Sequence, residues 1–276
     1  MKKHPALKYF RMDRPGIPHL WCPGCGIGQI WYYTVKAIDE LNLDPDKVLW
    51  VGGSGCTGRM CTYWNRDYMH TLHGRPLGFA SGVKLAKPEL TVICHMGDGE
   101  TAAIGGNHLI QTARRNVDIT AICVNNFNYG MTGGQFSPTT PLKGITMTSP
   151  TGNIEQNFDL CNLVKTCGAN YVARWTTAHP NQAINSIKNG IINKGFAFIE
   201  IISQCPTQYG RRNRLGNGVN MMKWFRENSV TLEKSKNMNE EEIRTKFIVG
   251  VFVDRENPEW VSSLREIAHT RSLNWK

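Results

Sequence analysis

Polar residues that could hold a metal ion follow two apolar segments of this chain. Asp98 comes just after the run Thr91–Met96, and Asn126 comes just after Ile119–Val124. Asp98 and Asn126 offer one charged and one neutral oxygen, and a backbone carbonyl near Asn128 could supply a third. So small a set of hard oxygen ligands suits Mg²⁺, which also takes phosphate oxygens and water. The pattern therefore predicts a magnesium–phosphate site.

Glycines flank Asp98 and indicate where a phosphate would lie. Gly97 and Gly99 let the backbone approach such a group, and a helix that begins near Glu100 would direct its N–H groups at it. A Gly-Asp-Gly sequence alone is more often a structural turn. Its combination with Asn-Asn after the next apolar run is much rarer by chance, and this combination favours a cofactor site.

The surrounding pattern predicts the elements that position these residues. The two apolar runs have the length and β-branched content of buried parallel strands, and Thr101–Arg115 between them has helical spacing. Such a unit has a right-handed crossover, and ligands bind at the carboxyl edge of its sheet. Further strands are predicted at Val48–Val51, Tyr171–Trp175, Phe196–Ile202 and Lys246–Asp254. Further helices are predicted at Ile27–Leu41, Gly78–Ala86, Phe158–Gly168, Asn181–Asn193, Asn237–Glu242 and Pro258–Arg271.

The composition is that of an ordinary globular protein, and the length fits one domain with an appendage. The 276 residues are 20% charged and 41% hydrophobic, and no apolar run approaches the length of a membrane span. The first residues lack the apolar core of a signal peptide, so we expect a cytoplasmic protein. The net charge of +10 would suit an acidic partner, either nucleic acid or an acidic protein or subunit, and charge alone does not decide between them. Because no nucleic-acid-binding motif is present, we expect that partner to be a protein.

Nine cysteines in such a protein argue against a disulfide framework. Cys22 and Cys25 form a Cys-x-x-Cys motif that opens onto a predicted helix, and it could be a redox disulfide, a zinc half-site or an iron–sulfur half-site. A thioredoxin-like redox motif normally follows a strand, and a zinc site would require a second Cys-x-x-Cys or a His pair as further ligands. An iron–sulfur cluster is favoured because its other thiolates can come from scattered positions.

Two more cysteines follow predicted strands at the sheet edge that carries Asp98. Cys56 lies in the glycine-rich turn Gly52–Gly58, and Cys205 is followed by a proline that prevents a helix from continuing through it. The turn could admit a cofactor closely, although it could also be only a tight connection. Cys61 lies five positions after Cys56. Topology favours Cys205 over Cys61 as the fourth thiolate.

These motifs together resemble a known family. GDGE, NNFNYGMTGGQ, WCPGCG, GSGCTGR and HTLHGR are similar to segments of the β subunit of the 2-oxoacid:ferredoxin oxidoreductases, from about Trp21 to Tyr209. The resemblance implies an α/β fold with a doubly wound, mostly parallel sheet of the thiamine-diphosphate-binding type and a C-terminal appendage. We expect an extended N-terminal arm at 1–20, a cofactor domain at 21–209, and an appendage at 210–276 that packs on the body or on a partner subunit.

The resemblance also implies roles for particular residues. Asp98, Asn126 and the carbonyl of Asn128 would hold Mg²⁺. A [4Fe–4S] cluster would be bound by Cys22, Cys25, Cys56 and Cys205. Thiamine diphosphate would contact Ser54, Gly55, Cys56, Thr57, His73, Gly97, Gly99, Glu100, Gly130 and Met131. A lone histidine is more often a satisfied polar residue than a ligand, and for His73 it is the resemblance that favours the cofactor role.

The function that the resemblance implies is the CoA-dependent oxidative decarboxylation of a 2-oxoacid, with electrons passed through the cluster to ferredoxin. No carboxylate in this chain fits the role of activating the cofactor. The family places that glutamate on an α subunit, so we expect activity only with that partner, with or without further small subunits. A non-oxidative thiamine enzyme would have no use for the cysteines, and a pure electron-transfer module would have no use for Asp98 and Asn126.

The resemblance favours 2-oxoglutarate as the substrate. The run NYGMTGGQFSPTTP looks most like β subunits that act on this acid. However, Gly133 stands where some archaeal relatives carry a lysine thought to meet the substrate carboxylate. Pyruvate or a branched-chain 2-oxoacid is therefore the alternative substrate, since a loop without a cation also suits an apolar tail.

Overall fold

The computed structural model describes residues 5–11 and 19–271, and an eight-stranded sheet forms its centre. The strands are β1 (Val48–Gly52), β2 (Tyr68–His70), β3 (Thr91–Gly97), β4 (Thr120–Asn125), β5 (Tyr171–Thr176), β6 (Ala197–Ile202), β7 (Ser229–Thr231) and β8 (Phe247–Asp254). Their order across the sheet is β2-β1-β3-β4-β6-β5-β8-β7. The β5–β8 pair is antiparallel, and the other pairs are parallel.

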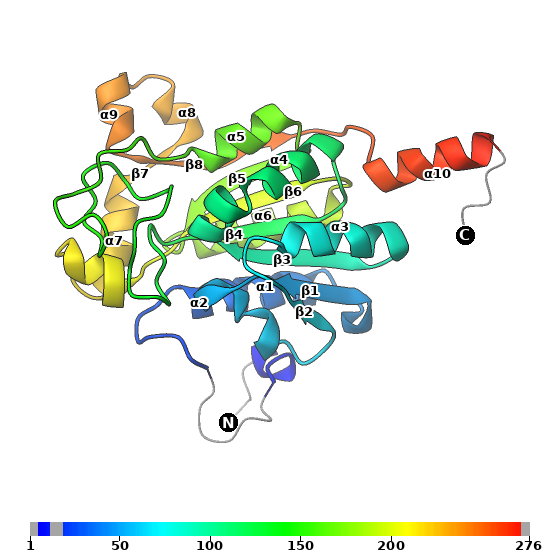
Figure 1. Ribbon diagram of the computed structural model, residues 1–276, viewed down its shortest axis with the longest axis horizontal. Coiled ribbons are helices and arrows are strands. Elements are labelled where there is room, and N and C mark those ends of the chain that lie inside the picture. The colour runs from blue at the N-terminus through cyan, green and yellow to red at the C-terminus, as the bar shows by residue number, and fades with distance from the viewer. Residues whose placement is uncertain (1–4, 12–18, 272–276) are drawn as a thin grey trace.

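Helices cover both faces of the sheet (Figure 1). One face is covered by α1 (Ile27–Glu40) and α6 (Pro180–Ile192), and the other by α3 (Pro76–Ala86), α4 (Gly106–Arg115) and α5 (Leu160–Cys167). A separate hydrophobic core lies under each helical layer. All six residues of β4 are buried, as expected for a parallel strand that is covered on both sides. The predicted doubly wound, mostly parallel sheet is confirmed.

The strand order explains why residues far apart in sequence can share one site. β1, β3, β4 and β6 are neighbours in the sheet and run parallel. Their carboxyl ends lead into the turns that carry Cys56, Asp98, Asn126 and Cys205, respectively. Four turns are thereby placed side by side at one edge of the sheet, the edge where open α/β sheets bind their ligands.

The predicted helix Thr101–Arg115 is wrong at its start. A π-helical turn spans Glu100–Ile104, and α4 begins only at Gly106. The N–H of Gly105 donates to the carbonyl of Glu100, five residues back, at 2.9 Å. A Cβ at Gly105 would lie 2.5 Å from that carbonyl oxygen, so a glycine is needed for the wider turn. Single π-turns of this kind often occur at functional sites.

The two ends of the chain also differ from the expectation. Residues Pro5–Lys8 of the arm predicted to be extended form a 3₁₀ helix, after which Phe10 makes a β-bridge with Trp64. Tyr9 and Trp64 stack, which gives this segment a buried face. Positions 12–18 of the predicted arm lie outside the described residues. After Tyr209, where no regular element was expected before residue 237, the structure has α7 (Gly218–Asn228), capped by the side chain of Asn217.

The last part of the chain extends the sheet. It contains β7, α8 (Leu232–Ser235), α9 (Glu240–Arg244), β8 and α10 (Trp260–Thr270). Phe225 of α7 and Phe247 of β8 pack near Phe127, which follows β4, and they form a third core beside the predicted cofactor edge. Among the residues that the structure describes, no helix is long and apolar enough to cross a membrane.

Candidate functional site

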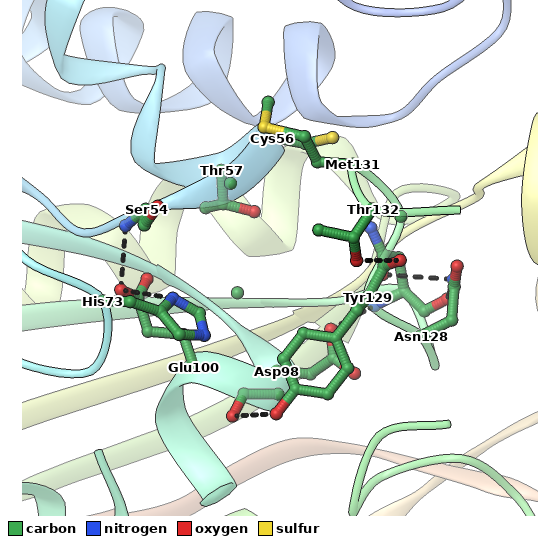
Figure 2. A pocket seen from close by; sticks show the side chains of 15 residues that line it. Ser54, Cys56, Thr57, His73, Asp98, Glu100, Asn128, Tyr129, Met131 and Thr132 are labelled. Carbon is green, nitrogen blue, oxygen red and sulfur yellow. Dashed lines mark hydrogen bonds and ion pairs between the residues drawn. The ribbon is translucent and has the colours of Figure 1, made fainter. Parts of the chain in front are cut away.

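A pocket of about 340 Å³ opens at the carboxyl ends of β1, β3 and β4 (Figure 2). Its lining consists of Ser54, Gly55, Cys56, Thr57, His73, Gly97, Asp98, Gly99, Glu100, Asn126, Asn128, Tyr129, Gly130, Met131 and Thr132. The structure thus brings together every residue that was predicted to contact thiamine diphosphate or Mg²⁺. Tyr129 and Thr132 line the pocket too; they were not predicted, although both lie within the NNFNYGMTGGQ run.

Asp98 is a buried carboxylate held in a fixed orientation. The hydroxyls of Ser137 and Thr139 each donate to its Oδ2 at 2.6 Å, and the N–H of Asn126 donates to Oδ1 at 3.4 Å. Burial raises the pKa of Asp98 to about 6, and the hydrogen bonds only partly oppose this effect. A bound cation would compensate the buried charge and favour the ionised form. Ser137 and Thr139 were not predicted, since they come from the loop after the GGQ segment.

Polar atoms of Asp98, Asn126 and Asn128 lie at the spacing of metal ligands. One terminal atom of the Asn126 amide lies 2.8 Å from the carbonyl oxygen of Asn128 and 3.3 Å from Oδ1 of Asp98. With nitrogen there, the amide donates to both oxygens. With oxygen there, three oxygens face one another and call for a cation. An octahedral Mg²⁺ with bonds of roughly 2.0–2.1 Å places neighbouring ligand oxygens about 2.9 Å apart. These residues therefore fit a magnesium ion.

Glu100 joins two of the turns around the pocket. Its Oε1 accepts the N–H of Ser54 and the N–H of Gly74, both at 2.9 Å, and lies 3.3 Å from Nδ1 of His73. The side chain is buried, and burial raises the pKa of its carboxyl. A Cβ at Gly53 would lie only 1.9 Å from this carboxylate, so the β1 turn closes over it because residue 53 is glycine. Glu100 thus lines the pocket, and its Oε1 accepts hydrogen bonds from backbone N–H groups of the two turns beside it.

Gly99 allows Tyr129 to close against the turn after β3. The Tyr129 hydroxyl donates to the carbonyl of Gly99 at 3.0 Å, and a Cβ at Gly99 would lie 2.4 Å from the Tyr129 ring. Any larger residue would push the ring away. Tyr129 itself begins a tight turn that is closed by its bridge to Gln135. On this turn Met131 is half exposed beside the pocket.

The four cysteines predicted to bind the cluster lie near one another. Sulfurs of both Cys56 and Cys205 lie within 4 Å of the position that a Cβ of Gly130 would take, at 3.9 and 3.6 Å. Burial raises the pKa of Cys25 to about 12 and that of Cys56 to about 11. Electrostatic repulsion from the neighbouring predicted cysteines adds to both shifts. Iron would favour the thiolates instead, since a coordinating thiol is deprotonated outright. Cys22 is exposed.

Cys61 lies apart from this group. It is fully buried, and its Sγ donates to the carbonyl of Gly58 at 3.1 Å. Within residues 5–11 and 19–271, no three His, Cys, Asp or Glu side chains converge as the ligands of a single metal ion.

Comparison with known proteins points to one family. Residues 52–201 match the family model described as thiamine pyrophosphate enzyme, C-terminal TPP binding domain. The chain is 53% identical to 2-oxoglutarate synthase subunit KorB of Methanocaldococcus jannaschii, over 96% of this chain and 97% of the relative. It is 43% identical to 2-oxoacid:ferredoxin oxidoreductase subunit beta of Saccharolobus solfataricus, over 68% of this chain and 62% of the relative.

A solved structure has the same fold along the whole chain. It is the 2-oxoglutarate:ferredoxin oxidoreductase from Magnetococcus marinus with 2-oxoglutarate, coenzyme A and succinyl-CoA bound. The TM-score is 0.85 at 30% sequence identity, and the match covers 100% of this chain and 94% of that chain.

Proposed function

This chain belongs to the thiamine-diphosphate-binding β subunits of the 2-oxoacid:ferredoxin oxidoreductases, and we propose that its substrate is 2-oxoglutarate. The reaction converts 2-oxoglutarate and coenzyme A to succinyl-CoA and CO₂, and it delivers two electrons to ferredoxin. The names of the similar KorB proteins and of the Magnetococcus marinus enzyme support this substrate. The observation that carries the assignment of the cofactors is that Asp98, Asn126 and the carbonyl of Asn128 lie at the same edge of the sheet as the predicted cluster cysteines.

Asp98, Asn126 and the carbonyl of Asn128 would hold Mg²⁺, which in turn holds the diphosphate. Thiamine diphosphate, when bound, supplies the electron sink that makes decarboxylation of a 2-oxoacid possible. The chain's own residues position it. Asp98 is fixed by two hydroxyl donors, and Gly99 leaves room for close backbone approach. Glu100 holds the turn that carries Ser54 and the turn that carries His73 at a set separation.

Cys22, Cys25, Cys56 and Cys205 would bind a [4Fe–4S] cluster that takes the electrons one at a time. Their mutual electrostatic effects support this assignment, and so does the place of Cys56 in the pocket lining. We assign no cluster role to Cys61, whose thiol donates to the carbonyl of Gly58 at 3.1 Å. We also propose a cytoplasmic location, which nine free cysteines support.

The α subunit would complete the active site. Thiamine enzymes need a carboxylate beside the aminopyrimidine ring, and the carboxylates that line this pocket are those of Asp98 and Glu100. Asp98 serves the metal, and Oε1 of Glu100 accepts two backbone N–H groups. Among the described residues, no Lys or Arg lines the pocket either, so the α subunit would also supply the cation for the distal carboxylate of 2-oxoglutarate.

The substrate assignment is tested by comparing kcat/KM for 2-oxoglutarate, pyruvate and 2-oxoisovalerate on the complex reconstituted with the α subunit, ferredoxin and coenzyme A. We expect 2-oxoglutarate to be preferred. A preference of tenfold or more for either monocarboxylate, about 1.4 kcal/mol of transition-state binding, would overturn the assignment.

A further inference from the structure

The segment that follows the fourth predicted cluster ligand is strongly basic. Residues 203–226 contain no Asp or Glu, and they carry Arg211, Arg212, Arg214, Lys223 and Arg226. The stretch begins beside Cys205 and ends in α7. Five cations with no acidic residue among them give this segment a net positive charge, in a chain of net charge +10.

This basic segment lies against the Cys-x-x-Cys turn. A Cβ at Gly218, the first residue of α7, would lie 2.5 Å from the carbonyl oxygen of Gly24. A Cβ at Gly24 would lie 3.4 Å from the Cα of Gly218 and 3.6 Å from Cγ of Pro206. The start of α7 is therefore in backbone contact with the turn between Cys22 and Cys25. The close approach depends on glycine at Gly218, while Gly24 has a φ of +76°, which favours glycine.

The cations of this segment are unpaired within the described structure. Arg211, Arg214, Lys223 and Arg226 are exposed, and none of them forms an ion pair with a carboxylate of residues 5–11 or 19–271. Cations near the C-terminal end of α1 are paired instead, since Lys36 and Lys188 both form ion pairs with Glu40. The positive charge beside the cysteines is thus left for an external anion.

Exposed apolar side chains occur on both segments that meet at the Gly24–Gly218 contact. Leu20 is 57% exposed and Val219 is 62% exposed. Cys22 and Pro23 follow Leu20 in the chain and are also exposed. The Gly24–Gly218 contact brings their turn against the start of α7, where Val219 lies. On α7, Val219 shares the exposed helix face with Lys223 and Arg226, at spacings of four and three residues. Small apolar contacts together with a charged rim are typical of protein interfaces, and electron-transfer encounters use interfaces of small area.

We propose that this surface, which we call the basic docking surface (Leu20, Cys22, Arg211, Arg214, Val219 and Lys223), receives an acidic iron–sulfur electron carrier. The inference rests on the proposed function, since it takes Cys22 to be a ligand of the cluster that donates the electrons. Docking here would bring the carrier's own cluster next to the most exposed of the four cysteines. Unpaired cations would steer the acidic carrier to this surface and orient it, an effect that salt screens.

The test uses the reconstituted complex carrying the double substitution Arg211→Glu and Arg214→Glu. An acidic [4Fe–4S] ferredoxin and methyl viologen serve as alternative electron acceptors at several salt concentrations. We expect KM for ferredoxin to rise at least tenfold at low salt and its salt dependence to weaken. Activity with methyl viologen, KM for coenzyme A and the subunit composition on gel filtration should match wild type. The control variant Lys87→Glu and Arg114→Glu reverses two exposed charges, at the end of α3 and on α4, well away from α7 (Figure 1), and should leave ferredoxin kinetics unchanged.

Three results would overturn the inference. An unchanged KM for ferredoxin would show that the carrier docks elsewhere. A raised KM for coenzyme A would assign the surface to that polyphosphate, and loss of the α subunit would assign it to the subunit interface. A wild-type complex without methyl viologen activity would instead refute the proposed function, which separates the two failures.

Discussion

Replacing Asp98 by asparagine should make the cofactor-free protein more stable while it removes cofactor binding. The change keeps the shape of the side chain and deletes its charge. Asp98 is 2% exposed, and Ser137 and Thr139 can still hydrogen-bond to an amide. Without bound metal, the wild-type protein must bury the ionised Asp98 carboxylate at neutral pH without a counter-ion, and this lowers the free energy of unfolding.

The size and sign of the effect follow from the pKa of Asp98. Burial raises this pKa from an ordinary value of 3.8 to about 6. The folded state therefore binds the proton more tightly than the unfolded state, so the contribution to stability is fully present below pH 3.8 and is lost as the pH rises through about 6. At about 1.4 kcal/mol for each unit of pKa, the loss is at most about 3 kcal/mol at neutral pH. The amide that replaces the carboxyl in the Asp98→Asn variant does not titrate, so the variant escapes this loss.

Thermal unfolding of the complex, stripped of thiamine diphosphate and Mg²⁺, measures this effect between pH 4 and pH 8. We expect the stability of the variant relative to wild type to increase as the pH rises, with most of the increase between pH 4 and pH 7. Adding Mg²⁺ and thiamine diphosphate at 100 times the dissociation constant should stabilise wild type by about 2.7 kcal/mol and leave the variant unchanged. A variant that is still stabilised by the cofactor would refute the metal role of Asp98. A stripped variant less stable than wild type at pH 7.5 would refute the charge argument.

Three further predictions concern the two cofactors and the partner subunit. Cys205→Ser should lose most of the iron and sulfide, whereas Cys61→Ser should keep both, and the reverse result in metal analysis would reassign the fourth ligand. Gly99→Ala should weaken thiamine diphosphate binding at least tenfold in calorimetry, because its Cβ would lie 2.4 Å from the Tyr129 ring; wild-type affinity would contradict the close-approach argument. The isolated chain should not oxidise 2-oxoglutarate with a dye acceptor until the α subunit is added, and turnover by the chain alone would contradict the shared active site.

The sequence predicted the elements that carry strong periodic patterns. The mostly apolar runs that became β3, β4 and β6 were placed to within one residue at each end, because parallel strands buried on both faces leave a clear signal even with His95 and Glu200 inside them. Asp98 and Asn126 could then be assigned to one sheet edge from topology alone. The same reasoning separated Cys205 from Cys61.

Features decided by tertiary contacts were not predictable. The π-turn Glu100–Ile104 depends on a backbone contact at Gly105, and periodicity carries no sign of it. Helix α7 has a weak pattern, and it is held by its contact with the Cys-x-x-Cys turn from the other end of the chain. The hydroxyl partners of Asp98 come from a loop about 40 residues away, so no local spacing reveals them.

Reduction of this chain's cluster by the substrate tests the central claim most directly. The reconstituted complex is mixed anaerobically with 2-oxoglutarate, without coenzyme A or ferredoxin, and frozen for electron paramagnetic resonance. We predict the signal of a reduced [4Fe–4S] cluster in wild type, and no such signal after removal of thiamine diphosphate or in the Cys205→Ser variant. A cluster that stays oxidised with 2-oxoglutarate, or that is reduced equally well without thiamine diphosphate, would contradict the claim that this chain carries electrons from the cofactor-bound substrate to its cluster.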